Sequence, residues 1–227
     1  SQMKNLTASA LLFLFCIQAV AQTASSADTS GTWQSYGSLL NKAKYPEIKG
    51  RLFNYNWRDL ETSPNVWNWV QFDNDLNAWA ADSLPVILLI YTKEDAPDWL
   101  YKNGVPKVTE KDEQGNSIGY SPYYADTDYK RFFKRMITNV HQHLETLPTG
   151  TRKQIIAIQA CLGNTGDYIG YKGIVDAKYA LTADEFFELY KEFSLYYYNE
   201  YANTSPKIYH LSNPSNDGAD ETNWLMA

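Results

Sequence analysis

Short apolar runs alternate with amphipathic segments along this chain. Four of the runs have the length and composition of buried strands: residues 51–57, 84–91, 155–158 and 207–212. Between them, apolar residues recur at helical spacing within residues 72–80, 132–144 and 186–197. This order predicts an α/β protein whose parallel strands are joined by right-handed helical crossovers.

Local signals mark the ends of the predicted elements. Asp126 or Thr127 can cap the second helix, and Thr182 with Glu185 forms a capping box at the start of the third. Turn residues at 113–116 are flanked by β-favouring side chains. They predict a small hairpin beside the main sheet.

Two features favour a (β/α)8 barrel of the TIM type over a dinucleotide-binding fold. The loops after the strands are polar, and no G-x-G-x-x-G sequence follows the first strand. Four strands are about half of the number that a closed barrel needs. We therefore expect residues 48–227 to form one domain, a barrel truncated to about its first half.

The residues before this domain are expected to direct export. The two residues ahead of Met3 are interpreted as additions to the natural start. The apolar stretch 11–17 is too short for stable membrane insertion, and with the small residues that end at Ala21 it is typical of a signal peptide at 1–21. Residues 22–47 are predicted to be a flexible leader. We expect a secreted or periplasmic, bacterial protein.

Composition narrows the range of partners. The formal net charge of −6 disfavours a nucleic-acid partner. Cys161 is the only cysteine after the signal peptide, and no Cys/His cluster indicates a metal site, so no disulfide, metal or other cofactor is expected. The 18 Tyr and 7 Trp residues suit stacking on sugar rings, although most such rings pack in cores or on surfaces.

The apolar run at 155–158 leads into residues 163–167, which read Gly-Asn-Thr-Gly-Asp. Glycines permit unusual backbone angles and close approach, and parallel α/β proteins place their chemistry in loops after the strands. Asp167 is therefore a candidate functional carboxylate. A capping role for Asp167 at the next turn explains the spacing equally well.

The stretch 57–69, WRDLETSPNVWNW, resembles an early element of the retaining glycoside hydrolases with (β/α)8 barrels (clan A), which follow the pattern W-x-x-L-E-P-x-x-G-x-Y-x-W. The sequence APDWL at 96–100 is similar to an element of family 42 β-galactosidases. Residues 163–167 are similar to the G-x-x-G-E loop that carries the acid in some of these enzymes. The resemblance covers most of residues 48–215.

Three departures from the family pattern stand out. Asn65 stands where the pattern has Gly, and Asp167 stands where it has Glu. The family's nucleophile, a Glu on a late strand, has no counterpart in this chain. The resemblance implies that Asp167 is the general acid/base.

The resemblance also implies a set of substrate-binding residues: Trp57, Glu61, Trp99, Asn164 and Asn213. The two tryptophans would be stacking platforms, with core packing an equal rival for Trp57 and a weaker one for Trp99. Glu61 would bind sugar hydroxyls, or equally would pair with Arg58 or cap its turn. The asparagines would bind hydroxyls, with an ordinary loop role the better interpretation of Asn213.

Two functions are compatible with this resemblance. The first is a secreted, β‑galactosidase-like retaining glycoside hydrolase that acts on oligo- or polysaccharides, present here as a fragment that lacks its nucleophile and is inactive alone. The alternative is a non-catalytic carbohydrate-binding protein on a degenerate barrel. The shortened acid and the missing nucleophile favour this alternative.

Overall fold

The computed structural model describes residues 30–35, 37–162, 170–211 and 223–225. Within them, one parallel sheet has five strands in the order β1 (Thr32–Gln34), β2 (Ile48–Asn56), β5 (Val86–Tyr91), β8 (Ile155–Gln159) and β9 (Lys207–Tyr209). The four strands predicted from the apolar runs are confirmed as β2, β5, β8 and β9.

The spatial order of the strands equals their order in the chain. Each crossover therefore returns to the neighbouring position, whereas a doubly wound dinucleotide-binding sheet reverses its order at a switch point. The result is a mixed α/β fold with a parallel central sheet, consistent with part of a TIM-barrel-like fold.

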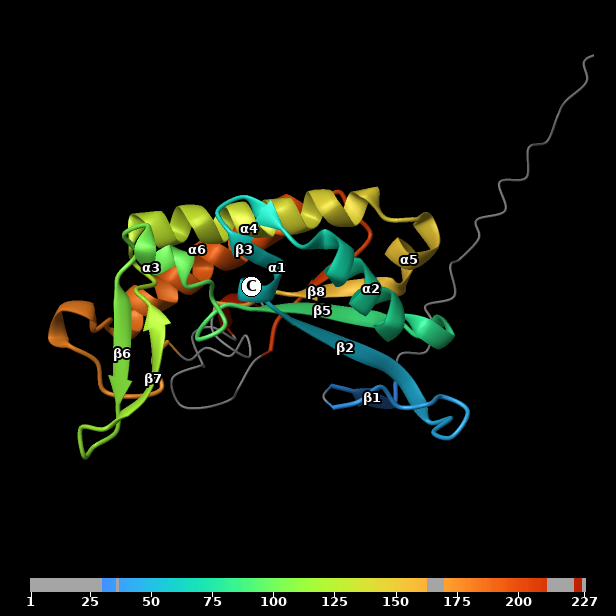
Figure 1. The fold of residues 1–227 in the computed structure, drawn as a ribbon, viewed down its shortest axis with the longest axis horizontal. Helices are drawn as coiled ribbons and strands as arrows, with labels where there is room; N and C mark the ends of the chain where they lie inside the picture. The colour runs from blue at the N-terminus through green and yellow to red at the C-terminus, as the bar shows by residue number, and fades with distance from the viewer. Residues whose placement is uncertain (1–29, 36, 163–169, 212–222, 226–227) are drawn as a thin grey trace, which may run out of the picture.

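Three helices cover one face of this sheet, as Figure 1 shows: α2 (Trp69–Trp79), α4 (Thr127–Thr146) and α6 (Ala183–Tyr201). Alternate side chains of the strands, such as Phe53 and Leu88, are buried in the same cluster as Phe72 of α2, Phe133 of α4 and Phe193 of α6. Burial of one such side chain contributes about 1.5–3 kcal/mol. The amphipathic spacing read from the sequence therefore places each helix on the sheet.

The predicted helix caps are confirmed. The Asp126 carboxylate accepts from the Tyr129 backbone N–H at 2.9 Å at the start of α4. At the start of α6, the Thr182 hydroxyl accepts from the Glu185 N–H, and the Glu185 side chain accepts from the Thr182 N–H. Each satisfies donors that the first helical turn leaves without partners.

The segment predicted as a flexible leader contributes a strand to the sheet. β1 pairs in parallel with β2, with Trp33 opposite Gly50. A Cβ atom at Gly50 would lie 2.4 Å from the Trp33 ring, so only glycine lets the indole lie on the strand. The sequence signal for β1 was Gly50 alone, and no hydrophobic pattern accompanies it.

Short elements fill the connections. The predicted hairpin is confirmed as β6 (Lys107–Lys111) and β7 (Ser117–Pro122). Residues between β2 and α2 form α1 (Trp57–Leu60) and a second small hairpin, β3 (Glu61–Ser63) with β4 (Val66–Trp67). The remaining short helices are η1 (Ala81–Ser83), α3 (Trp99–Lys102), α5 (Thr149–Gln154) and η2 (Ala177–Tyr179).

Asn65 turns the β3–β4 hairpin with φ at 62°. Glycine adopts this left-handed conformation freely and asparagine tolerates it better than most residues. Asparagine is therefore compatible with the left-handed turn at this position.

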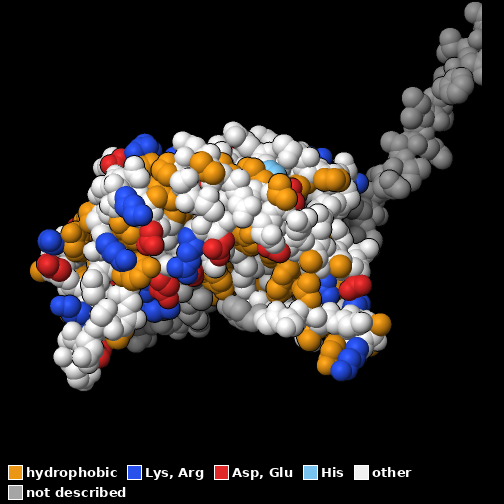
Figure 2. Space-filling model, viewed as in Figure 1, with side chains coloured by type: hydrophobic (Ala, Val, Ile, Leu, Met, Phe, Trp, Pro, Cys, Tyr) orange, Lys and Arg blue, Asp and Glu red, His pale blue; other side chains and the backbone are white. Residues whose placement is uncertain are grey.

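The visible surface mixes charges of both signs with apolar side chains, and Figure 2 shows no broad field of one sign on this face. Within the described residues, no helix has the length and apolar content that a membrane span requires.

Candidate functional site

The chain leaves β2, β5 and β8 at the carboxyl edge of the sheet, where parallel α/β proteins place their chemistry. The hairpin β6–β7 projects at this same end of the molecule (Figure 1). Two buried carboxylates, Glu61 and Glu110, organise the described part of this edge.

Glu61 follows α1 and has no exposed surface. One oxygen accepts from the Trp57 indole N–H at 3.0 Å. The other accepts from the Asn65 backbone N–H at 2.8 Å and from the Arg135 guanidinium of α4. This carboxylate therefore connects the segment that follows β2 to helix α4.

Desolvation dominates the electrostatics of this pair. Burial raises the pKa of Glu61, and the Asn65 N–H, the Trp57 N–H and the Arg135 charge oppose that rise. Burial also lowers the pKa of Arg135. Arg58, one of the alternative partners that the sequence left open for Glu61, instead pairs with Asp95.

Trp57 and Trp99 pack edge to face, with ring centroids 6.3 Å apart at 90°. Trp57 has no exposed surface, and Trp99 is 7% exposed. The Trp99 indole donates to the Glu61 carbonyl oxygen at 2.9 Å, and the Arg135 guanidinium lies over its ring at 5.4 Å. A stacking platform needs an exposed ring face, so this burial favours the core-packing role that the sequence left open for both rings.

The second cluster surrounds Glu110 of β6, which is 1% exposed. Its Oε2 accepts from the Lys93 ammonium at 2.9 Å, and its Oε1 accepts from the Ser121 hydroxyl of β7. Sequence reasoning missed both Lys93 and Glu110. The available signal was the period-two spacing of Val108 and Glu110, which puts the carboxylate on the buried face of β6.

Buried phenols line the space beside this cluster. Tyr124 and Tyr129 have no exposed surface, and Tyr171 stacks on Tyr124 with ring centroids 5.2 Å apart. Burial raises the pKa of Tyr124 and of Tyr129 well above its usual range, so both phenols stay neutral near pH 7. The predicted free thiol, Cys161, is buried after β8, with its sulfur 3.9 Å from the Thr92 hydroxyl.

Three sequence-predicted site residues, Asn164, Asp167 and Asn213, lie outside the described residues. The nearest described residues to Asp167 are Leu162 and Gly170. Cys161 and Leu162 precede residues 163–169 and are buried, and the chain resumes at Gly170.

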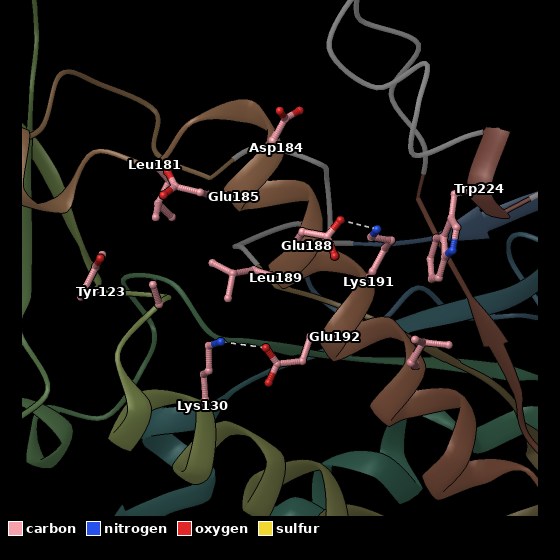
Figure 3. Close-up of a pocket in the computed structure, with 12 residues that line it drawn as sticks. Tyr123, Lys130, Leu181, Asp184, Glu185, Glu188, Leu189, Lys191, Glu192 and Trp224 are labelled. Carbon is pink, nitrogen blue, oxygen red and sulfur yellow. Dashed lines mark hydrogen bonds and ion pairs between the residues drawn. The ribbon is translucent and has the colours of Figure 1, made fainter.

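A groove of about 780 Å³ lies on the outer side of the helix layer, between the start of α4 and α6 (Figure 3). Leu181, Leu189 and Trp224 supply apolar walls. Its charged groups include two ion pairs that Figure 3 shows: Lys130 of α4 pairs with Glu192 of α6, and Lys191 pairs with Glu188 one turn away on α6. Carboxylates paired in this way are poor candidates for proton transfer.

Across the described part of the chain, no group of three or more His, Cys, Asp or Glu side chains could hold a metal ion. A candidate metal centre is therefore not found among these residues.

No protein-family model and no curated protein sequence matches the chain. Among solved structures, it is similar to the AHE enzyme from Alicyclobacillus herbarius, with a TM-score of 0.44, 16% identity, and coverage of 73% of this chain and 34% of that one. It is also similar to a β-galactosidase from the Antarctic haloarchaeon Halorubrum lacusprofundi, with a TM-score of 0.39, 12% identity, and coverage of 57% of this chain and 20% of that one. The chain thus spans about a third and a fifth of the lengths of these two enzymes.

Proposed function

We propose that this chain belongs to an exported carbohydrate-active enzyme, a β‑galactosidase-like retaining glycoside hydrolase in which Asp167 is the general acid/base. The observation that carries the proposal is the position of β8. It is an interior strand of a singly wound parallel sheet, and three residues separate its carboxyl end from the Gly-Asn-Thr-Gly-Asp segment.

Retaining hydrolysis needs two carboxyl groups with different protonation. One delivers a proton to the leaving oxygen, and the other is ionised and attacks the anomeric carbon from about 5–5.5 Å away. Glu61 and Glu110 suit neither task, because each has essentially no exposed surface and is bound by a cation and by further N–H or O–H donors. Their contacts support positioning roles, and the proposal assigns proton transfer to Asp167.

The test compares Asp167→Asn with wild type in the full-length protein on two substrates. Lactose needs protonation of its leaving group, and p-nitrophenyl β-galactoside does not. We expect the rate on lactose to fall about 10²–10⁴-fold, the usual contribution of general acid catalysis. The first step on the activated substrate should fall much less.

Asp176→Asn is the matched control, because Asp176 is an exposed carboxylate that caps η2. It should leave both rates unchanged. Equal losses on the two substrates in Asp167→Asn would remove Asp167 from the acid/base role. Sugar binding without hydrolysis by the wild-type protein would support the alternative, a non-catalytic carbohydrate-binding protein, which the shorter Asp in place of Glu favours.

A further inference from the structure

The carboxylate of Glu110 joins three segments that are distant in sequence. Besides the Lys93 ammonium from the loop after β5 and the Ser121 hydroxyl from β7, it accepts the Lys172 backbone N–H at Oε2, 2.5 Å away. Lys172 belongs to the chain that resumes after residues 163–169. One buried side chain therefore connects the loop after β5, the hairpin and residues 172–174, which we call the returning segment.

The returning segment also pairs with the hairpin through its backbone. The Lys111 N–H donates to the Ile174 carbonyl at 2.9 Å, and the Ile174 N–H donates to the Lys111 carbonyl at 2.8 Å. Between these contacts, Gly173 packs so closely that a Cβ atom would lie 2.6 Å from the Lys111 oxygen and 2.8 Å from the Ile118 side chain. Residues 172–174 thus lie against the hairpin as a short third strand would.

The described residues on each side of residues 163–169 are therefore fixed by packing or hydrogen bonds. Upstream, Cys161 and Leu162 are 3% and 2% exposed at the end of β8. Downstream, the stacked pair Tyr171 and Tyr124 leads directly into the Glu110 contact. The candidate acid Asp167 lies between these two fixed points in the sequence.

We propose that Glu110 is a positioning residue, which fixes residues 172–174 on the hairpin and so sets the point at which the chain that follows Asp167 joins the hairpin. That this positioning affects catalysis rests on the proposed function. The attachment of residues 172–174 to the hairpin through Glu110 does not. A carboxylate suits the task because its two oxygens bind several donors in defined directions, while the Lys93 ammonium balances its charge. An apolar side chain could fill the same space without orienting the Lys172 N–H.

The first experiment measures amide hydrogen exchange in the 227-residue chain. Glu110→Gln removes the charge, and Gly173→Ala forces the returning segment away from the Lys111 oxygen. In both variants we expect the Lys111 and Ile174 amides to exchange at least about 10-fold faster, with the amides of β2 and β5 unchanged, because only the local opening becomes easier. Gly150→Ala is the control, since a Cβ atom there meets nothing within 4 Å.

Unchanged exchange at Lys111 and Ile174 in folded Glu110→Gln overturns the proposal. If the buried ammonium, left with only the Glu94 carboxylate at 3.8 Å, prevents that variant from folding, the double variant Lys93→Met/Glu110→Gln removes both charges and is measured in the same way. Faster exchange at the two amides in the double variant supports the proposal, and unchanged exchange overturns it.

The second experiment measures kcat and KM of Gly173→Ala in the full-length protein on lactose and p-nitrophenyl β-galactoside. A displaced acid should lower kcat on lactose by about 10- to 100-fold and affect the activated substrate less, with little change in KM. Faster exchange with unchanged kcat on both substrates overturns the positioning role and leaves the glycosidase intact. If wild type hydrolyses neither sugar, the proposed function fails, while the exchange result still decides the attachment.

Discussion

Glu61 and Glu110 lie at the same edge of the sheet, are equally buried, and differ in the cation that each one meets. Glu61 pairs with the Arg135 guanidinium, whose side chain is 22% exposed. Glu110 pairs with the Lys93 ammonium, whose side chain is 3% exposed. The first pair is open to water on its cationic side, and the second is closed on both sides.

The difference in hydration of the two cations distinguishes two ways of attaching a loop to the rest of the fold. A guanidinium at a partly wet boundary keeps part of its hydration, so the Glu61 pair attaches the chain after β2 to α4 with a moderate desolvation penalty. A dry ammonium–carboxylate pair loses nearly all hydration, so Glu110 depends on the Lys93 ammonium, which itself also lies 3.8 Å from the Glu94 carboxylate. The Glu110 cluster should therefore be the more sensitive of the two to loss of one partner.

The largest effect is expected from Lys93→Met, which leaves the Glu110 carboxylate buried without its cation. Breaking such a pair typically lowers the free energy of unfolding by about 3–5 kcal/mol. Urea denaturation measures the loss. Lys93→Met/Glu110→Gln should recover most of it, because no unpaired charge then stays buried; a double variant as unstable as the single one would contradict the comparison.

A smaller effect is expected from Arg135→Met. Glu61 keeps the Trp57 and Asn65 donors, and water can reach the vacated side, so the free energy of unfolding should fall by about 1.5–3 kcal/mol, the range for a hydrogen bond to a charged group. Arg131→Met is the matched control on the same helix, because its pair with Asp128 is exposed and contributes about 0–1 kcal/mol. If Arg135→Met lowered the free energy of unfolding as much as Lys93→Met, the partly hydrated pair and the fully buried pair would not differ in the way we expect.

The smallest effect is a pH dependence that belongs to Glu61. Because burial raises its folded pKa above the usual 4.5, the folded chain holds a proton in a window above that pH where the unfolded chain has released it. The contribution of Glu61 to stability is therefore greatest below pH 4.5 and declines as pH rises through the folded pKa. Urea midpoints of wild type and Glu61→Gln across this window measure it, and a difference that grows in the opposite direction would show that Arg135 outweighs burial.

Elements with a strong local pattern were predictable from the sequence. Phe132 to Leu144 repeats at helical spacing behind a capping aspartate, and residues 84–91 form a long apolar run, so α4 and β5 followed from the chain alone. β1 and the β3–β4 hairpin have no such pattern. They are held by partners elsewhere in the chain, such as Gly50 for Trp33, which a local reading cannot supply.

The candidate site was less predictable because its contacts span the sequence. Nothing near Glu61 indicates that its cation comes from α4, and Arg58, its neighbour in the chain, pairs with Asp95 instead. Likewise, Lys93 and Glu110 face each other only because the hairpin folds back over the loop after β5. Asp167, Asn164 and Asn213 lie outside the described residues, so their roles stay predictions.

The connection between β5 and β8 carries both the hairpin and α4, so Val86 must find Ile155 across a much longer stretch of chain than separates Leu52 from Ile87. Closing a longer loop loses more chain entropy, and non-local pairings slow folding. The β2–α2–β5 unit can therefore form early as a local nucleus, while the centre of the sheet waits for the hairpin and α4 to collapse. During that interval the edge of β5 is open to pairing with another chain, which makes the speed of this one closure a determinant of yield in refolding.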